Sequence, residues 1–193
     1  MKKGFAFIFL LLAVILVQTC KGKAKSGKTL TETSDSTEFF PVNLYIQGQI
    51  VRVDSLATNI YKIAISGGNR DSSLITKQEF KQLAQTFLEY DISRKQLHRF
   101  YKESVFADQT TESLTFNYTA MADTLPLRSI DVLMDSTGTK TKNIFIGKEK
   151  SAGDSTVIEK DGWKNDESFF INRAIQKGNN AATMQRTVVV WRF

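Results

Sequence analysis

LTFNYTA (residues 114–120) is the first of six short segments that set the architecture of this 193-residue chain; the others are SIDVLMD (129–135), KNIFIGK (142–148), STVIEKDGW (155–163), SFFINRAI (168–175) and QRTVVVWRF (185–193). Apolar and polar residues alternate in these segments, so that Leu114, Phe116 and Tyr118 fall on one face of an extended chain. Runs of glycine, asparagine, aspartate and serine separate the segments and favour turns. Because no helical pattern lies between them, we expect an antiparallel meander of about six strands.

Two helices are expected before these strands. Apolar residues recur at three- and four-residue steps in residues 39–57, and Thr76 with Glu79 forms a capping box that starts a second helix. Between them, NIYKIAIS (59–66) predicts a strand that can join the sheet as a seventh. A strand is the alternative for residues 39–57, since Gly48 weakens a helix by ~1 kcal/mol. The expected fold class is α+β, an antiparallel β-meander of about six to seven strands with the two main helices packed on one face.

The N-terminal stretch MKKGFAFIFLLLAVILVQTC (1–20) has the pattern of a secretory leader, with Lys2 and Lys3 before an apolar run over residues 4–17. As a helix rising ~1.5 Å per residue, that run spans roughly 21 Å and falls short of a bilayer core of ~30 Å. A cleaved leader is therefore favoured over a permanent membrane span. An uncleaved anchor is the alternative.

The residues VQTC (17–20) resemble the lipobox of bacterial lipoprotein precursors. The resemblance implies that Cys20 becomes linked to diacylglycerol, that residues 1–19 are removed as a signal peptide, and that the new amino group is acylated with a fatty-acyl chain such as palmitate. Thr19 departs from the small residue usual at that position. Independently, Cys20 is the only cysteine, so no disulfide can form within the molecule.

The chain divides into three parts. After the expected signal peptide (1–19), residues 20–38 contain the cysteine that the resemblance marks for lipidation and a tether rich in lysine, serine and threonine that buries too little apolar surface to fold. Residues 39–193 form a single α+β globular domain. Because no acidic residue closely follows the cysteine, the lipoprotein resemblance favours the outer membrane, on the side facing the periplasm.

The net charge of +6 does not indicate a nucleic-acid partner. Two lysines belong to the leader and four to the tether, which leaves 20 basic residues facing 17 acidic ones in the expected domain. No basic run is interleaved with aromatic residues. The partners expected are the membrane, through the lipid anchor, and an envelope protein or an apolar ligand.

Few residues are suited to catalysis. His98, the only histidine, lies in a shorter helix predicted to start at Ser93, and we expect it at a surface or helix end rather than in a catalytic triad. Metal ligation has no supporting motif, so we expect neither a metal nor another cofactor. Three carboxylate pairs could serve as acid and base in glycoside hydrolysis, although most are expected to be solvated: Glu103 with Asp108, Asp131 with Asp135, and Glu159 with Asp161.

Aromatic residues gather in the last hairpins, and we single out Trp163, Trp191 and Phe193 as contacts for a partner or ligand. Packing in the core is the alternative role for them. The function expected is that of a non-enzymatic, membrane-anchored envelope lipoprotein that binds a protein or ligand. One alternative is a carrier of lipid or acyl chains with a cavity between the sheet and the first helix, and a second is a small envelope hydrolase.

Overall fold

The computed structural model describes residues 38–193. The expected signal peptide, Cys20 and nearly all of the tether lie outside the described residues. Within 38–193, none of the helices combines the length and the apolar character needed to cross a bilayer.

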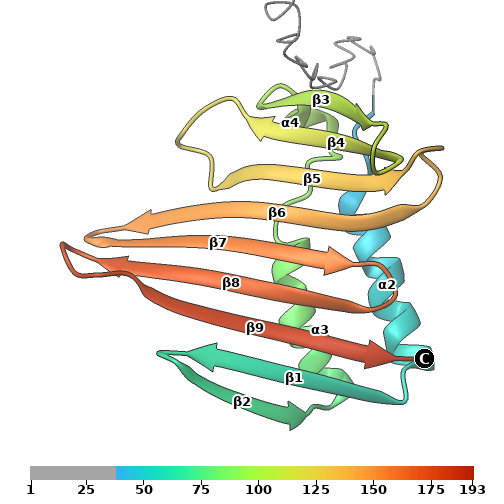
Figure 1. Ribbon diagram of the computed structural model, residues 1–193. Coiled ribbons are helices and arrows are strands. Elements are labelled where there is room, and N and C mark those ends of the chain that lie inside the picture. Colours follow the sequence, from blue (N-terminus) through green and yellow to red (C-terminus); the bar gives the residue numbers. More distant parts are fainter. Residues whose placement is uncertain (1–37) are drawn as a thin grey trace, which may run out of the picture.

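In the described part of the chain, nine strands form one antiparallel sheet in the order β2-β1-β9-β8-β7-β6-β5-β4-β3 (Figure 1). Strands β3 to β9 follow one another both in the sequence and in space, while the β1–β2 hairpin adds to the outer edge of β9. The strands are β1 (Asn59–Ser66), β2 (Asn69–Leu74), β3 (Tyr101–Asp108), β4 (Ser113–Ala120), β5 (Leu127–Asp135), β6 (Thr141–Ala152), β7 (Ser155–Lys164), β8 (Ser168–Lys177) and β9 (Thr183–Arg192).

The expected α+β class and antiparallel meander are confirmed, but the expected number of six to seven strands is wrong. The six alternating segments form β4 to β9, and residues 59–66 form β1. The two missed strands are β2 and β3. In β2 nearly every side chain is exposed, so it carries no buried stripe that an alternating pattern could reveal. Its hairpin with β1 is built on Gly67 and Gly68, which both have positive φ and suit a tight two-residue turn.

The helices precede or interrupt the strands. Residues 39–57 contain α2 (Val42–Leu56), which confirms the helix and excludes the alternative strand. The predicted N-cap at Thr76 is confirmed, since the Glu79 amide donates to the Thr76 hydroxyl at the start of α3 (Lys77–Ala84), which continues into the 3-10 helix η1 (Gln85–Leu88). The capping box itself is only half formed, because the Glu79 carboxylate pairs with Lys62.

The helix predicted from Ser93 is only α4 (Lys95–His98). Its N-cap residue is Arg94, and the Ser93 hydroxyl donates to Asp91 instead of capping the helix. The predicted start signal at Ser93 is therefore wrong, because a nearer carboxylate takes its hydrogen bond.

The core lies between the sheet and the helices, which Figure 1 shows crossing behind the strands. Helix α2 buries a stripe of Val42, Ile46, Ile50 and Val53. Phe80 and Phe87, from α3 and η1, contact the sheet through Trp163, with ring centroids 6.4 and 5.2 Å from the indole. We refer to the opposite side of the sheet, which no helix within residues 38–193 covers, as the open face.

Candidate functional site

The open face carries rows of side chains set by the pairing of β7, β8 and β9. Neighbouring residues of a strand point to opposite faces, so Glu159, Asp161 and Trp163 point toward the helices while Ile158 and Lys160 point to the open face. The register then places outward side chains opposite one another in two parallel rows. One is the apolar row Ile158–Ala174–Met184, and the other is the cationic row Lys160–Asn172–Arg186.

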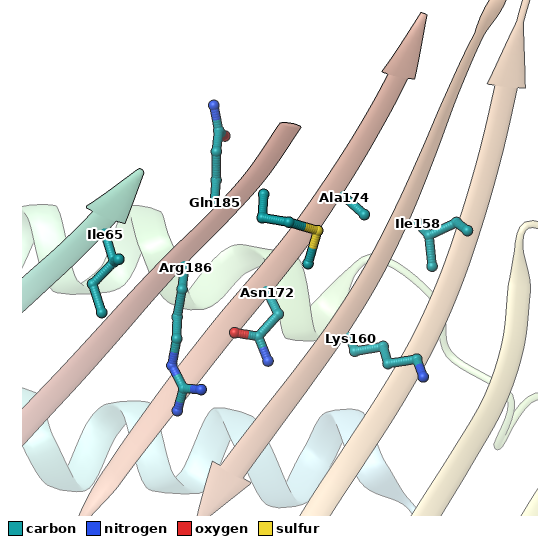
Figure 2. Close-up of a pocket in the computed structure, with 8 residues that line it drawn as sticks. Ile65, Ile158, Lys160, Asn172, Ala174, Gln185 and Arg186 are labelled. Carbon is teal, nitrogen blue, oxygen red and sulfur yellow. The ribbon is translucent and has the colours of Figure 1, made fainter. Parts of the chain in front are cut away.

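These two rows line a hollow of about 560 Å³ in the open face, completed by Ile65 and Gln185 (Figure 2). The hollow follows from side-chain length. On the middle strand β8 the rows carry the short residues Asn172 and Ala174, whereas the flanking strands β7 and β9 carry longer ones. Figure 2 shows the labelled side chains on the near side of the strands with the helices behind them. The volume is within the range of ~300–1,000 Å³ typical of small-molecule sites.

A further apolar row borders the cationic row, so the charged side chains lie between two apolar strips. It contains Phe170 opposite Val188 and, across β7, the buried Gly162. A Cβ at Gly162 would lie 2.4 Å from the Phe170 ring and 3.1 Å from that of Phe145, so glycine allows both rings to cover this point of the sheet. Several of the apolar side chains on the open face are exposed: Tyr61, Phe145, Ile158 and Met184.

The charge of the hollow is unbalanced. Its lining contains Lys160 and Arg186 but neither aspartate nor glutamate. Within residues 38–193 no carboxylate forms an ion pair with either cation. The Arg186 guanidinium lies 5.3 Å from the centroid of the Phe170 ring, a cation–π contact that leaves its N–H groups available. The hollow therefore joins an apolar surface to two unpaired cations.

The opposite face of β6 and β7 holds a second polar feature, which we call the ion cluster: Lys148, Glu159 and Asp161 with Thr86 and Arg173. Lys148 forms ion pairs with both carboxylates, at 2.8 Å from Asp161 Oδ2, and is almost fully buried. The Thr86 hydroxyl donates to Glu159 at 2.8 Å and accepts from the Lys148 ammonium at 2.5 Å. Arg173 forms an ion pair with Glu159 from the rim.

The pKa values of the two carboxylates of the ion cluster are shifted in opposite directions. Burial raises the pKa of Asp161 above its ordinary range, opposed by Lys148 and assisted by the charge of Glu159. For Glu159 burial also acts upward, but hydrogen bonds from Lys148, Thr86 and Arg173 outweigh it and hold the pKa of that carboxyl well below its ordinary range. Separated pKa values of this kind can accompany acid–base catalysis, but buried ion networks produce them too.

The surroundings of the ion cluster favour a structural role. The hollow beside it measures about 160 Å³ and is lined by charged side chains that already pair with one another, including Glu89 with Lys150. The Asp161 side chain is fully buried and does not line that hollow. The sequence pointed to Glu159 and Asp161 as a pair, and the structure brings them together. They are not solvated, however, because they share the inward face of β7 with Trp163.

The aromatic residues singled out from the sequence do not share one surface. Trp163 and Trp191 are only 1% and 2% exposed and pack against each other with centroids 5.5 Å apart. Phe193 is 47% exposed, with the Arg52 guanidinium 4.9 Å from its ring. We therefore assign both indoles to the core, because neither side chain is accessible to a partner, and only Phe193 lies at the surface.

The remaining candidates serve local structure. Asp108 and Asp135 accept hydrogen bonds from the turns that follow them. The Thr111 hydroxyl, followed by the Thr110 amide, lowers the pKa of the Asp108 carboxyl, and the Lys140 amide lowers that of Asp135. Asp131 accepts a hydrogen bond from the Asn117 amide on the neighbouring strand. His98 ends α4 and stacks on Phe39 at 4.1 Å. In the part of the chain that the structure describes, no three potential ligands gather as a metal site would require.

The residues that line the hollow were not singled out from the sequence. Lys160, Asn172 and Arg186 lie in three different strands, and only the register of those strands makes them neighbours. The one available signal is weak: each lies at an outward position of its strand, two residues from Ile158, Ala174 and Met184 respectively.

Comparisons with known proteins assign no family. No protein-family model matches the chain, and no curated protein matches it. Among solved structures, an S-type phycobiliprotein lyase from Guillardia theta aligns over 79% of this chain and 92% of its own, with 5% sequence identity and a TM-score of 0.27. A likeness this weak supports no conclusion about the fold or the activity, so the function must be inferred from the chain itself.

Proposed function

We propose that this chain is an exported protein of a bacterial cell envelope, attached to the outer membrane through lipid on Cys20, which acts by binding rather than by catalysis. Its binding surface is the open face of the sheet. Export and attachment rest on the sequence of residues 1–20. One observation carries the binding role: the hollow of about 560 Å³ between β7, β8 and β9, where apolar side chains and two cations that pair with no described carboxylate remain accessible.

The open face fits a binding role better than the other side of the sheet. Between the sheet and α2 the space is filled by fully buried side chains such as Ile46, Val53 and Ile144. An acyl-chain cavity under the first helix, as the carrier alternative requires, has no support there. An apolar ligand would instead lie on the open face, where side chains are exposed and none of the described elements covers them.

Binding at the hollow predicts a position-dependent photocrosslink. With benzoylphenylalanine in place of Met184, at the rim, irradiation of cells producing the full chain is expected to give an adduct of defined mass. The matched control is Met121, which is 68% exposed against 60% for Met184 but does not line the hollow. Intact-mass spectrometry of the purified protein reads out the adducts. Identical adducts at both positions, or none at Met184, would contradict binding at the open face.

Attachment through Cys20 predicts that the protein incorporates a radiolabelled fatty acid and sediments with membranes. The Cys20→Ala variant should lose the label, because its side chain cannot form the thioether. An unlabelled wild-type protein that sediments with membranes and retains residues 1–19 would support the uncleaved anchor instead. An unlabelled protein in the cytosolic fraction would disprove export altogether.

A further inference from the structure

We propose that the hollow binds a single-chain amphiphile with an anionic head group, a carboxylate or a phosphate, held between Lys160 and Arg186. This inference rests on the proposed function, since it names the class of ligand for the same open face. Three properties of the hollow support it: the sign of its charge, the place of that charge among apolar rows, and its size.

The two cations flank one position on the open face, above Asn172. In Figure 2 the Lys160 side chain extends away from Asn172, so binding of one anion there requires the lysine to change rotamer. Lys160 and Arg186 lie on either side of Asn172, with strands at ~4.8 Å spacing and therefore roughly 10 Å between the two backbones. Both side chains are long, and the shorter Asn172 leaves space between them. A carboxylate or phosphate in that space accepts two parallel hydrogen bonds from a guanidinium, a third from the ammonium and a fourth from the Asn172 amide.

The same row continues toward the edge of the sheet. Ile65 of β1 is opposite Arg186, and Arg70 of β2 is opposite Ile65. A third cation therefore lies on the row, which strengthens the positive potential of this part of the open face. Attraction of an anion needs no displacement of a resident carboxylate, because none lines the hollow.

An apolar chain has a path beside the cations. The row Ile158–Ala174–Met184 lies one step along the strands from the cationic row, with Ala174 at its lowest point. Met184 is unbranched and adapts its shape to a flexible chain. The volume of about 560 Å³ suits one acyl chain rather than a two-chain phospholipid. An uncharged apolar ligand would leave both cations without a partner. The hollow therefore favours a ligand with an anionic head group.

The test uses photoreactive ligands and the full-length chain with Cys20→Ala, so that no probe becomes attached through acylation. Three sixteen-carbon probes with a diazirine on the chain differ only in the head group: a carboxylate, a phosphate monoester and an uncharged alcohol. After irradiation, crosslinked peptides are mapped by mass spectrometry. We expect the anionic probes to label β7, β8 and β9 on the open face, and unmodified palmitate to compete with the carboxylate probe.

Charge reversal supplies the decisive comparison. Lys160→Glu with Arg186→Glu is expected to lower labelling by the anionic probes at least tenfold and to leave labelling by the alcohol nearly unchanged. The control is Lys102→Glu with Lys140→Glu, which reverses the same charge at exposed positions on β3 and in the β5–β6 turn, outside the hollow. Circular dichroism during urea unfolding checks that both double variants are folded.

Each outcome has a defined meaning. Labelling by the carboxylate probe alone identifies a fatty acid as the ligand, and labelling by the phosphate probe alone identifies a lysophospholipid type of ligand. Equal labelling by all three probes, unchanged by charge reversal, would overturn the anionic head group while leaving the open face as a binding site. If no probe labels the open face, this inference is wrong. In that case, a protein adduct from benzoylphenylalanine at position 184 shows that the open face binds a protein partner, whereas the absence of any adduct means that the proposed function is wrong as well.

Discussion

Lys148→Met is expected to lower the free energy of unfolding by about 3–5 kcal/mol, the usual cost of removing one partner from a buried ion pair. The side chain of Lys148 is 2% exposed and forms ion pairs with Glu159 and Asp161. Methionine fills a similar volume but supplies no charge and no donor. Two carboxylates would then remain in the interior with only Arg173, at the rim, to compensate Glu159. Urea unfolding followed by circular dichroism measures the loss.

Lys150→Met is the matched control for this prediction. Lys150 lies two residues further along β6, and its side chain is 51% exposed and paired with Glu89. Because exposed ion pairs contribute little, this variant should cost no more than about 1 kcal/mol. A second variant, Lys148→Met with Asp161→Asn, should recover part of the loss since it removes one of the uncompensated charges. Equal effects at Lys148 and Lys150 would show that the ion cluster is not a buried network.

The sequence predicts which face of β7 the residues of the ion cluster occupy, but not that this cluster is buried. The alternation that predicted β7 also fixes the face of each residue, and positions 159, 161 and 163 must share one face. Lysines beside the carboxylates suggested a solvated strand edge instead. What the sequence could not show is Thr86, which η1 places above the strand 73 residues away from Glu159 in the chain.

The same limit applies to the open face. Strands β4 to β9 could be predicted because each carries its own alternating pattern, which is local information. The hollow depends on which residues of β7, β8 and β9 lie opposite one another. A shift of one residue in the pairing of β8 would place Arg173 instead of Asn172 between Lys160 and Arg186. The register of each strand depends on the whole sheet, so the sequence could not predict a binding site assembled from residues of three strands.

The two missed strands have a related cause. In β2, NRDSSL offers no apolar face, and its place in the sheet rests on backbone hydrogen bonds with β1 and on the Gly67-Gly68 turn. In β3, Tyr101 is the one buried residue, so the alternation of this strand is too weak to stand out from a loop. Both strands are at the edges of the sheet, and an edge strand has a neighbouring strand on one side only. Fewer of its side chains are therefore buried, and its sequence alternates less clearly between apolar and polar residues.

Trp163→Ala is expected to lower the free energy of unfolding by about 3–5 kcal/mol, because it leaves a large cavity in the aromatic part of the core. The indole is 1% exposed, and its ring centroid lies 5.2 Å from those of Phe87 and Phe169 and 5.5 Å from that of Trp191. These neighbours are themselves held in place, since Phe169 packs against both Phe87 and Trp191, so none of them can move far enough to fill the space.

Phe193→Ala is the control that separates the core role of an aromatic residue from a surface role. Phe193 is 47% exposed, and its main interaction is with the Arg52 guanidinium, so the variant should cost no more than about 1 kcal/mol. Urea unfolding followed by circular dichroism avoids dependence on tryptophan fluorescence, which Trp163→Ala itself alters. A small loss for Trp163→Ala, together with loss of the crosslink from position 184, would return Trp163 to the binding surface. A large loss that spares the crosslink at a temperature where the variant is folded would place it in the core alone.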